Sequence, residues 1–169
     1  SEDVDYPYHP NGTLRYLTGT TQEETIYVMQ KGKAKLHQIF TKDYNLQYEK
    51  WIGKVATHDD VRKISGIQNI RSHDEFEETI TKILDAMPEG STLWLERGND
   101  PEREDYSSAQ LFANEHREQV TEKGVTIKSY RSLTHKMREI KSPGEIEALR
   151  VATEISALGH NAGMRRAMT

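Results

Sequence analysis

The sequence contains no cysteine among its 169 residues. Disulfide bonds and thiolate metal sites are therefore excluded, and the composition fits a reducing compartment such as the cytoplasm. No run approaches about 18 consecutive apolar residues, so neither a membrane-spanning helix nor the core of a signal peptide is predicted. We expect a cytoplasmic protein with no membrane partner. The first residue is Ser1 rather than methionine, so the sequence does not define targeting.

The chain also lacks an excess of positive charge. Its 23 Lys and Arg residues are outnumbered by 27 Asp and Glu residues, and the formal net charge is −4. The basic residues are spread along the chain, whereas a nucleic-acid-binding surface is basic and clustered. Apolar residues make up only 34% of the chain, below the roughly 45–50% of ordinary domains. We therefore expect no nucleic-acid partner, a modest core and much exposed helix surface.

Periodic segments nevertheless predict regular structure. Residues 25–40 form two β-prone runs around Lys31-Gly32-Lys33 and predict a β-hairpin, and residues 14–19 predict a short strand ended by Gly19. Residues 72–87 predict a helix that begins with a Ser72–Glu75 capping box. Its apolar face is formed by Phe76, Ile80, Ile83, Leu84 and Met87.

Strands and helices alternate along the second half of the chain. We expect a strand within residues 88–96, a helix over 105–124, a strand over 125–131 and a short helix over 133–141. The apolar stripe predicted for the second of these segments consists of Tyr106, Ala109, Ala113 and Val120. Alternation of this kind indicates an α/β layer with βαβ crossovers, and the early hairpin makes its sheet mixed.

The closing segment has a strong helix start and no clear stop. Ser142 stands at the N-cap, Pro143 at the first helical position, and Glu145 completes a capping box. Ile146, Leu149 and Ile155 recur at helical spacing and predict one apolar stripe. A helix that begins so well usually leads into further structure, so we expect the sequence to be a piece of a longer polypeptide.

The residues that could carry chemistry form no recognised pattern. The two-histidine zinc motif, the glycine-rich phosphate loops and the serine nucleophile elbow are all missing. The triplets at residues 58–60 and 73–75 each combine histidine with acidic residues, but both stand where a helix begins, and acidic residues there favour the helix dipole. The acidic run at residues 99–105 lacks the spacing of a calcium loop. We interpret all three as structural.

Three stretches remain distinctive when taken together, namely residues 5–19, 48–53 and 137–168. In this order they resemble the N-terminal domain of the Xaa-Pro aminopeptidase, prolidase and creatinase family. The family's early segment is matched by Tyr6, Pro7, Tyr8, Asn11, Leu14, Tyr16, Leu17, Thr18 and Gly19. Its W-x-G motif is matched by Trp51 and Gly53. Its linker is matched by Met137, Arg138, Ile140, Lys141, Ser142, Glu145, Ile146, Leu149, Arg150, Ala152 and Ile155.

The resemblance implies an α/β fold with a mixed β-sheet flanked by helices over residues 1–141. Residues 142–169 would then form the first helix of a C-terminal catalytic domain with the "pita-bread" fold. In the family that domain holds two divalent metal ions, commonly manganese, through two Asp, one His and two Glu. These ligands all come later in the chain than the matched part. The resemblance therefore implies no catalytic residue, metal ligand or cofactor within this segment.

The function implied for the whole protein is that of a Xaa-Pro aminopeptidase-like metallopeptidase, which removes an N-terminal residue that precedes proline. This domain would shape substrate access and supply subunit contacts. Its implied partners are its own catalytic domain, further copies in a homo-oligomer and short proline-containing peptides. Two alternatives stay open: a prolidase- or creatinase-type parent, and the protein-interaction module of a catalytically inactive, histone-chaperone-like relative.

Trp51 is the one candidate site residue. In family members resembling aminopeptidase P, the tryptophan of W-x-G projects toward an active-site mouth, and the resemblance implies the same place for Trp51. An indole face suits a rigid, apolar proline ring. The residues alone favour a different interpretation, in which Trp51 is a core aromatic side chain or one that anchors the loop after the hairpin.

Overall fold

The computed structural model describes residues 10–32, 36–96, 111 and 114–167. The chain divides into two compact units, residues 1–128 and residues 129–169. Within the described residues, no helix has both the length and the apolar character needed to cross a membrane.

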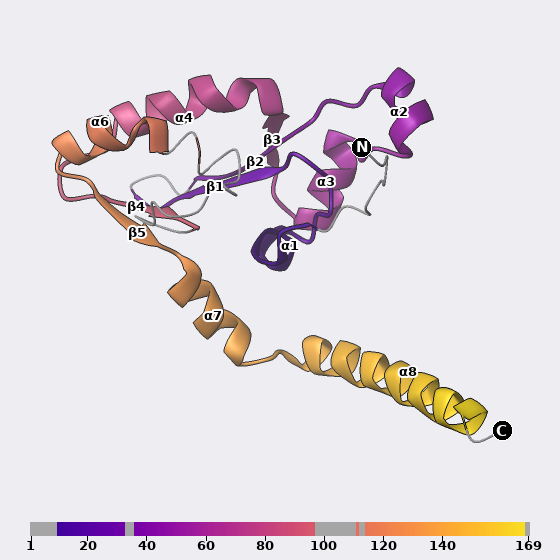
Figure 1. The fold of residues 1–169 in the computed structure, drawn as a ribbon. Coiled ribbons are helices and arrows are strands. Elements are labelled where there is room, and N and C mark those ends of the chain that lie inside the picture. Colours follow the sequence, from indigo (N-terminus) through magenta and orange to yellow (C-terminus); the bar gives the residue numbers. More distant parts are fainter. Residues whose placement is uncertain (1–9, 33–35, 97–110, 112–113, 168–169) are drawn as a thin grey trace, which may run out of the picture. The chain divides into compact units, whose positions relative to one another are not determined.

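A mixed three-stranded sheet lies at the centre of the first unit (Figure 1). Strands β1 (Ile26–Gln30) and β2 (Leu36–Thr41) pair antiparallel, with Ile26 opposite Phe40, which confirms the predicted hairpin. Strand β3 (Asn69–Ser72) pairs parallel to β2, with Gln38 opposite Asn69. Parallel neighbours need a crossover, and helices α2 (Leu46–Ile52) and α3 (His58–Ser65) form it.

The first helix packs on α3 and corrects one prediction. Residues 12–18 form helix α1 (Gly12–Thr18), not the predicted strand. Asn11 caps its start by accepting bonds from the backbone N–H groups of Thr13 and Leu14, and Gly19 ends it at φ 72°. A Cβ added to Gly19 would lie 3.2 Å from Cγ2 of Ile64 in α3. The Asn cap and the left-handed glycine thus override the strand-like alternation between them.

The two faces of the sheet are covered by different helices. Ile39 of β2 packs with Val61 of α3 and Ile70 of β3, and all three side chains are buried. The next residue on β2, Phe40, points to the opposite face because successive strand side chains alternate. Its ring meets that of Phe76 edge to face at a centroid distance of 5.4 Å. Phe76 opens helix α4 (Phe76–Asp85), which follows the short 3-10 helix η1 (His73–Glu75).

A second, two-stranded sheet pairs β4 (Thr92–Leu95) with β5 (Thr126–Ser129). Helix α6 (Arg117–Glu122) precedes β5. Leu84, Val120 and Val125 form the buried cluster beside this sheet, and Ile80, Met87 and Leu93 pack against it. The predicted apolar face of α4 and the placing of Val120 are confirmed, whereas Tyr106, Ala109 and Ala113 lie outside the described residues. The described strands form two sheets rather than one continuous layer.

The second unit consists mainly of two helices, α7 (Arg131–Glu139) and α8 (Pro143–Ala167). The predicted capping box is present: Ser142 N–H donates to Glu145 Oε2 at 2.8 Å, and Glu145 N–H donates to Ser142 Oγ at 3.3 Å. None of the α8 residues is buried. Taken as a whole, the described structure is a mixed α/β fold with small sheets flanked by helices, as predicted from the sequence.

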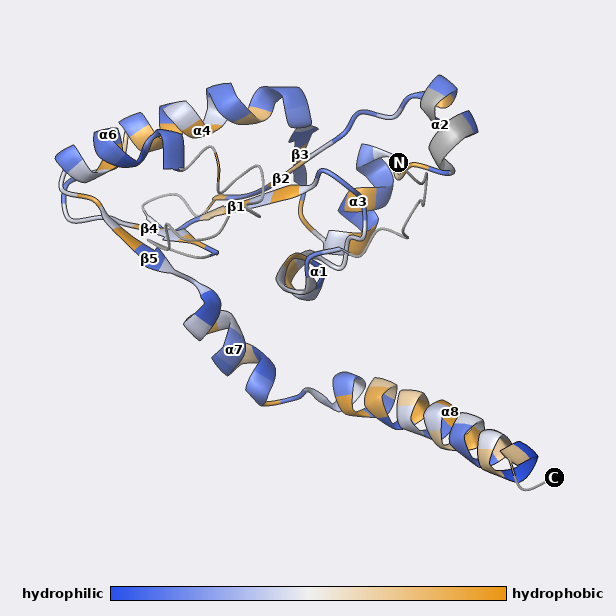
Figure 2. Cartoon of the chain, viewed as in Figure 1, coloured by the Kyte–Doolittle hydropathy of each residue, from blue (hydrophilic) through white to orange (hydrophobic). Residues whose placement is uncertain are grey.

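The apolar residues of α8 do not form the single stripe that the sequence spacing predicted. At about 100° per residue, Ile155 lies on the side of the helix opposite Ile146. The exposed apolar side chains fall into two opposite groups, and Figure 2 shows apolar residues along the whole helix. One group is Ile146, Leu149 and Met164, the other is Val151, Ile155 and Leu158, and their exposure ranges from 44% to 66%.

Candidate functional site

The W-x-G motif stands at the end of α2. Asn45 caps the start of this helix, and its side-chain oxygen accepts a bond from Gln47 N–H at 2.9 Å. Trp51 occupies the last turn. Gly53 follows as the C-cap with φ 85°, and its N–H donates to the carbonyl of Glu49 at 3.0 Å. Such a positive φ favours glycine, so the motif places its tryptophan two residues before a forced helix end.

The carboxylate of Glu49 joins the segments on either side of α2. Its Oε1 accepts a bond from Val55 N–H at 3.0 Å, and its Oε2 accepts one from the Tyr44 hydroxyl at 3.2 Å. Burial raises the pKa of Tyr44, and the negative charge and hydrogen bond of Glu49 raise it further. Tyr44 therefore remains a neutral donor at ordinary pH. Sequence reasoning missed this contact, because a bond from residue 49 to residue 55 across a helix end has no local pattern.

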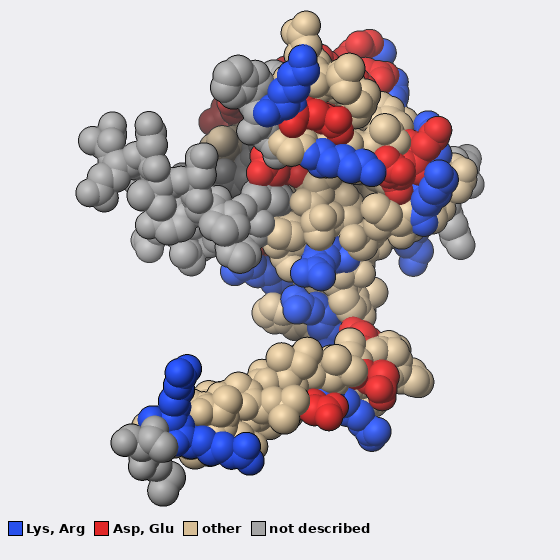
Figure 3. All heavy atoms as spheres, turned by 90° about the vertical axis from the view of Figure 1, so that its right-hand side faces the viewer, with Lys and Arg blue, Asp and Glu red and all other residues tan. Residues whose placement is uncertain are grey.

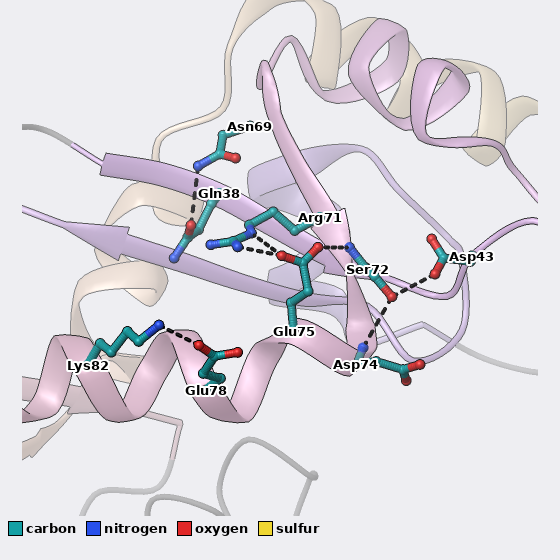
Figure 4. Close-up of polar contacts among 9 residues, drawn as sticks. All are labelled: Gln38, Asp43, Asn69, Arg71, Ser72, Asp74, Glu75, Glu78 and Lys82. Carbon is teal, nitrogen blue, oxygen red and sulfur yellow. Dashed lines mark hydrogen bonds and ion pairs between the residues drawn. The ribbon is translucent and has the colours of Figure 1, made fainter.

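A polar cluster lies where the parallel strands β2 and β3 end (Figure 4). Ser72 Oγ donates to Asp43 Oδ2 at 2.7 Å. Nε2 of His58 lies 3.2 Å from Asp43 Oδ1, but this buried nitrogen is not in hydrogen-bonding geometry. Serine, aspartate and histidine therefore meet with the aspartate in the middle. Activating a serine requires the histidine beside it, so this cluster does not form a nucleophile.

Both His-acidic triplets serve as helix caps, as predicted. Thr57 and Asp60 form a reciprocal capping box at α3, and Ser72 and Glu75 form another at η1. The hydrogen bonds from the Thr57 side chain and backbone lower the pKa of Asp60. Over the part of the chain that the structure describes, no group of three or more His, Asp or Glu residues is arranged to hold a metal ion.

The face of the sheet beneath α4 carries further paired polar groups. Asn69 Nδ2 donates to Gln38 Oε1 at 3.2 Å, and Arg71 pairs with Glu75 (Figure 4). Glu78 pairs with Lys82, whose hydrogen bond and charge lower the pKa of Glu78. The first contact joins β3 to β2, the second joins β3 to η1, and the third runs along α4. All three hold structure and present no reactive group.

One surface hollow lies between α4 and the residues before α6. Its volume is about 390 Å³, and its lining consists of Glu77, Glu78, Thr81, Lys82, Glu115 and His116. Lys82 is paired with Glu78, and the Thr81 hydroxyl bonds to a carbonyl of its own helix. On the face of the first unit seen in Figure 3, positive and negative side chains are interspersed. The hollow therefore offers acidic lining without an activated nucleophile.

Comparison with known proteins defines the class of the chain. The family model of the aminopeptidase P N-terminal domain matches residues 1–94, and the chain belongs to this family. It is 25% identical to the Xaa-Pro aminopeptidase of Escherichia coli (strain K12) over 175 aligned residues, which cover 98% of this chain and 38% of the relative. Human Xaa-Pro aminopeptidase 3 is 24% identical, over 93% of this chain and 31% of its own length.

Solved structures show the same relationship. Proline aminopeptidase P II from Yersinia pestis superposes with a TM-score of 0.74 and 25% identity over 95% of this chain and 37% of that protein. Zinc-substituted E. coli aminopeptidase P in complex with product superposes with a TM-score of 0.74 at 25% identity, covering 95% and 36%. The chain thus spans 38% of the length of the E. coli relative and 31% of that of the human relative. It contains the N-terminal domain of a protein of the Xaa-Pro aminopeptidase family.

Proposed function

We propose that this chain is the non-catalytic N-terminal domain of a metallopeptidase that removes an N-terminal residue preceding proline. The supporting observation is the match to the E. coli Xaa-Pro aminopeptidase, which extends over 98% of this chain but only 38% of the relative. The domain would shape substrate access to the active site and contribute contacts between subunits of a homo-oligomer.

The metal chemistry of the proposed enzyme does not reside in the described residues. They hold no group of three or more potential ligands, so they do not fit a pair of divalent ions such as manganese. In a dinuclear peptidase such ions activate water and polarise the peptide carbonyl. The metal ligands would come from a region that corresponds to the part of the relatives beyond the matched third. The N-terminal domain would then affect substrate binding and not the chemical step.

Helix α8 supports a division of the chain near Ser142. We propose that residues 1–141 form the N-terminal domain and that residues 142–169 open the catalytic domain. A helix with apolar residues on opposite sides is typical of one buried inside a larger domain. Ile146 and Ile155, on opposite sides of α8, are 44% and 66% exposed in the described unit, and further structure of the proposed catalytic domain would cover both sides.

Trp51 is the proposed contact with substrate. Covering an apolar side chain contributes about 1.5–3 kcal/mol, or roughly ten- to hundredfold in an equilibrium constant. Trp51→Ala in the full-length protein should therefore lower kcat/KM for Xaa-Pro peptides by about that factor. Trp94→Ala is the matched control, because Trp94 is 42% exposed on β4 and should leave kcat/KM unchanged.

Two outcomes would contradict the proposal. Normal kinetics with a lowered melting temperature for Trp51→Ala would show that Trp51 anchors its loop instead. Failure of the full-length protein to hydrolyse any Xaa-Pro peptide in the presence of divalent ions would refute the peptidase assignment and favour an interaction module.

A further inference from the structure

Residues 43–58 leave the sheet after β2 and return at the start of α3, and we name this stretch the α2 excursion. Figure 1 shows α2 set apart from both sheets. Leu46 is 64% exposed, and Gln47 and Lys50 are exposed as well. These three side chains do not pack into the core, and polar contacts link the helix to the domain.

Glu49 is the residue that makes those contacts on both sides of the helix. Tyr44 lies on the segment entering α2 and Val55 on the segment leaving it, and each donates a hydrogen bond to a different oxygen of the Glu49 carboxylate. We name these three residues the Glu49 clasp. Val55 is only 6% exposed, so its N–H has little access to water as a substitute partner.

Other contacts connect the two ends of the α2 excursion to each other and to the rest of the domain. Asp43 and His58, at its two ends, approach to 3.2 Å. Ala56 N–H donates to Gln22 Oε1 at 3.1 Å, which ties the returning segment to the loop before β1. These contacts lie at the ends of the excursion and outside α2, whereas the Glu49 clasp acts on the helix itself.

We infer that Glu49 is a positioning residue that holds α2, and with it Trp51, in one orientation on the domain. Trp51 stands two residues after Glu49 in the same seven-residue helix. Anchoring the Glu49 carboxylate to both flanking segments therefore restricts rotation of the helix that carries the tryptophan. The consequence for substrate binding rests on the proposed function, whereas the clasp itself rests on the contacts of Glu49.

The first test measures amide hydrogen exchange of Val55 by NMR in the unmodified chain. Although Val55 lies outside any helix or strand, its amide should exchange at least about tenfold more slowly than that of a solvated loop residue. Glu49→Ala should abolish this protection, and Glu49→Gln should keep it because the amide oxygen still accepts the bond. An unprotected Val55 amide in the unmodified chain would overturn the inference without any variant.

The second test follows Trp51 itself by fluorescence in a Trp94→Phe background. Glu49→Ala should raise acrylamide quenching of Trp51 by about twofold or more as the helix loosens. Glu49→Gln should restore the original value. Glu145→Ala is the matched control, because Glu145 also accepts bonds from a backbone N–H and a hydroxyl, both of Ser142 at 2.8 Å. Unchanged quenching in a folded Glu49→Ala protein would refute the positioning role.

Kinetics of the full-length protein separate this inference from the proposed function. If both hold, Glu49→Ala raises KM for Xaa-Pro peptides while kcat is retained. If the clasp tests succeed but Trp51→Ala has normal kinetics, the positioning role stands and the substrate contact fails. If Trp51→Ala impairs kinetics but Glu49→Ala changes neither exchange nor quenching, the substrate contact stands and the positioning role fails.

Discussion

Replacing Gln38 by methionine should stabilise the protein, although Gln38 lies in the central strand of the three-stranded sheet. The residue is 2% exposed and is followed on β2 by Ile39 and Phe40, which are fully buried. Its Oε1 accepts a bond from Asn69, but its Nε2 is buried without a partner. Exchanging the oxygen and nitrogen of the amide would still leave one of the two atoms unpaired, so the strand carries an unsatisfied polar group in either orientation.

The expected gain follows from two opposing effects. Removing a buried, unpaired donor relieves a desolvation penalty of about 1–3 kcal/mol, whereas losing the bond from Asn69 costs about 0.5–1.5 kcal/mol. Asn69 is exposed, so water can replace its lost acceptor. Methionine has the length and unbranched shape of glutamine and leaves no cavity. We expect Gln38→Met to raise the free energy of unfolding by about 1 kcal/mol.

Urea unfolding followed by circular dichroism measures this change. With an m-value of about 1–3 kcal/mol/M, the midpoint should rise by roughly 0.3–1 M. Gln38→Ala is the control: it removes the same unpaired atom but leaves a cavity, so its midpoint should lie below that of Gln38→Met. A midpoint for Gln38→Met below that of the unmodified chain would refute the reasoning and show that the Nε2 donor has a partner.

Three further perturbations test other features. Hydrogen bonds from Thr57 lower the pKa of Asp60 from its usual 3.8. The stabilising contribution of the Asp60 carboxylate is therefore complete above pH 3.8 and is lost as the pH falls through the lowered pKa of the folded state. Asp60→Asn should flatten the acid side of a plot of melting temperature against pH. Leu158→Glu should reduce self-association of this chain in light scattering, because Leu158 is 64% exposed on an apolar side of α8, and equal scattering would contradict this. Gly19→Ala should cost about 1–2 kcal/mol in urea unfolding, since φ is 72° and Ile64 lies 3.2 Å from the added Cβ; an unchanged midpoint would contradict it.

The sequence by itself determined the elements whose signals are local. Two β-prone runs around Lys31-Gly32-Lys33 were enough to predict the β1–β2 hairpin. The capping boxes at Ser72 and Ser142 were also correctly predicted, because each is a reciprocal bond between residues three apart. The W-x-G and linker motifs indicated the family, which the match to residues 1–94 confirms. In each of these cases, the residues that determine the local structure lie within a few positions of one another in the sequence.

Local patterns failed where a second signal competed with them. Residues 14–19 alternate like a strand, but Asn11 outside that window caps a helix and Gly19 terminates it. Ile146 and Leu149 are one helical step apart, but Ile155 comes six residues after Leu149, and a rotation of about 100° per residue places it on the side of α8 opposite Ile146. The role of Trp51 stays a prediction, since its chain position is described but its substrate contact is untested.

Only the tertiary structure decided which distant groups meet. The bond from Val55 to Glu49, the contact of Asp43 with Ser72 and the pairing of Asn69 with Gln38 join segments brought together by the β2–α3–β3 crossover. Gln38 Nε2 is likewise a tertiary outcome, since it is buried and no partner reaches it. Such contacts depend on strand register and helix placement, which are set by burial across the whole domain. The residues next to a given residue in the sequence therefore do not predict its long-range contacts.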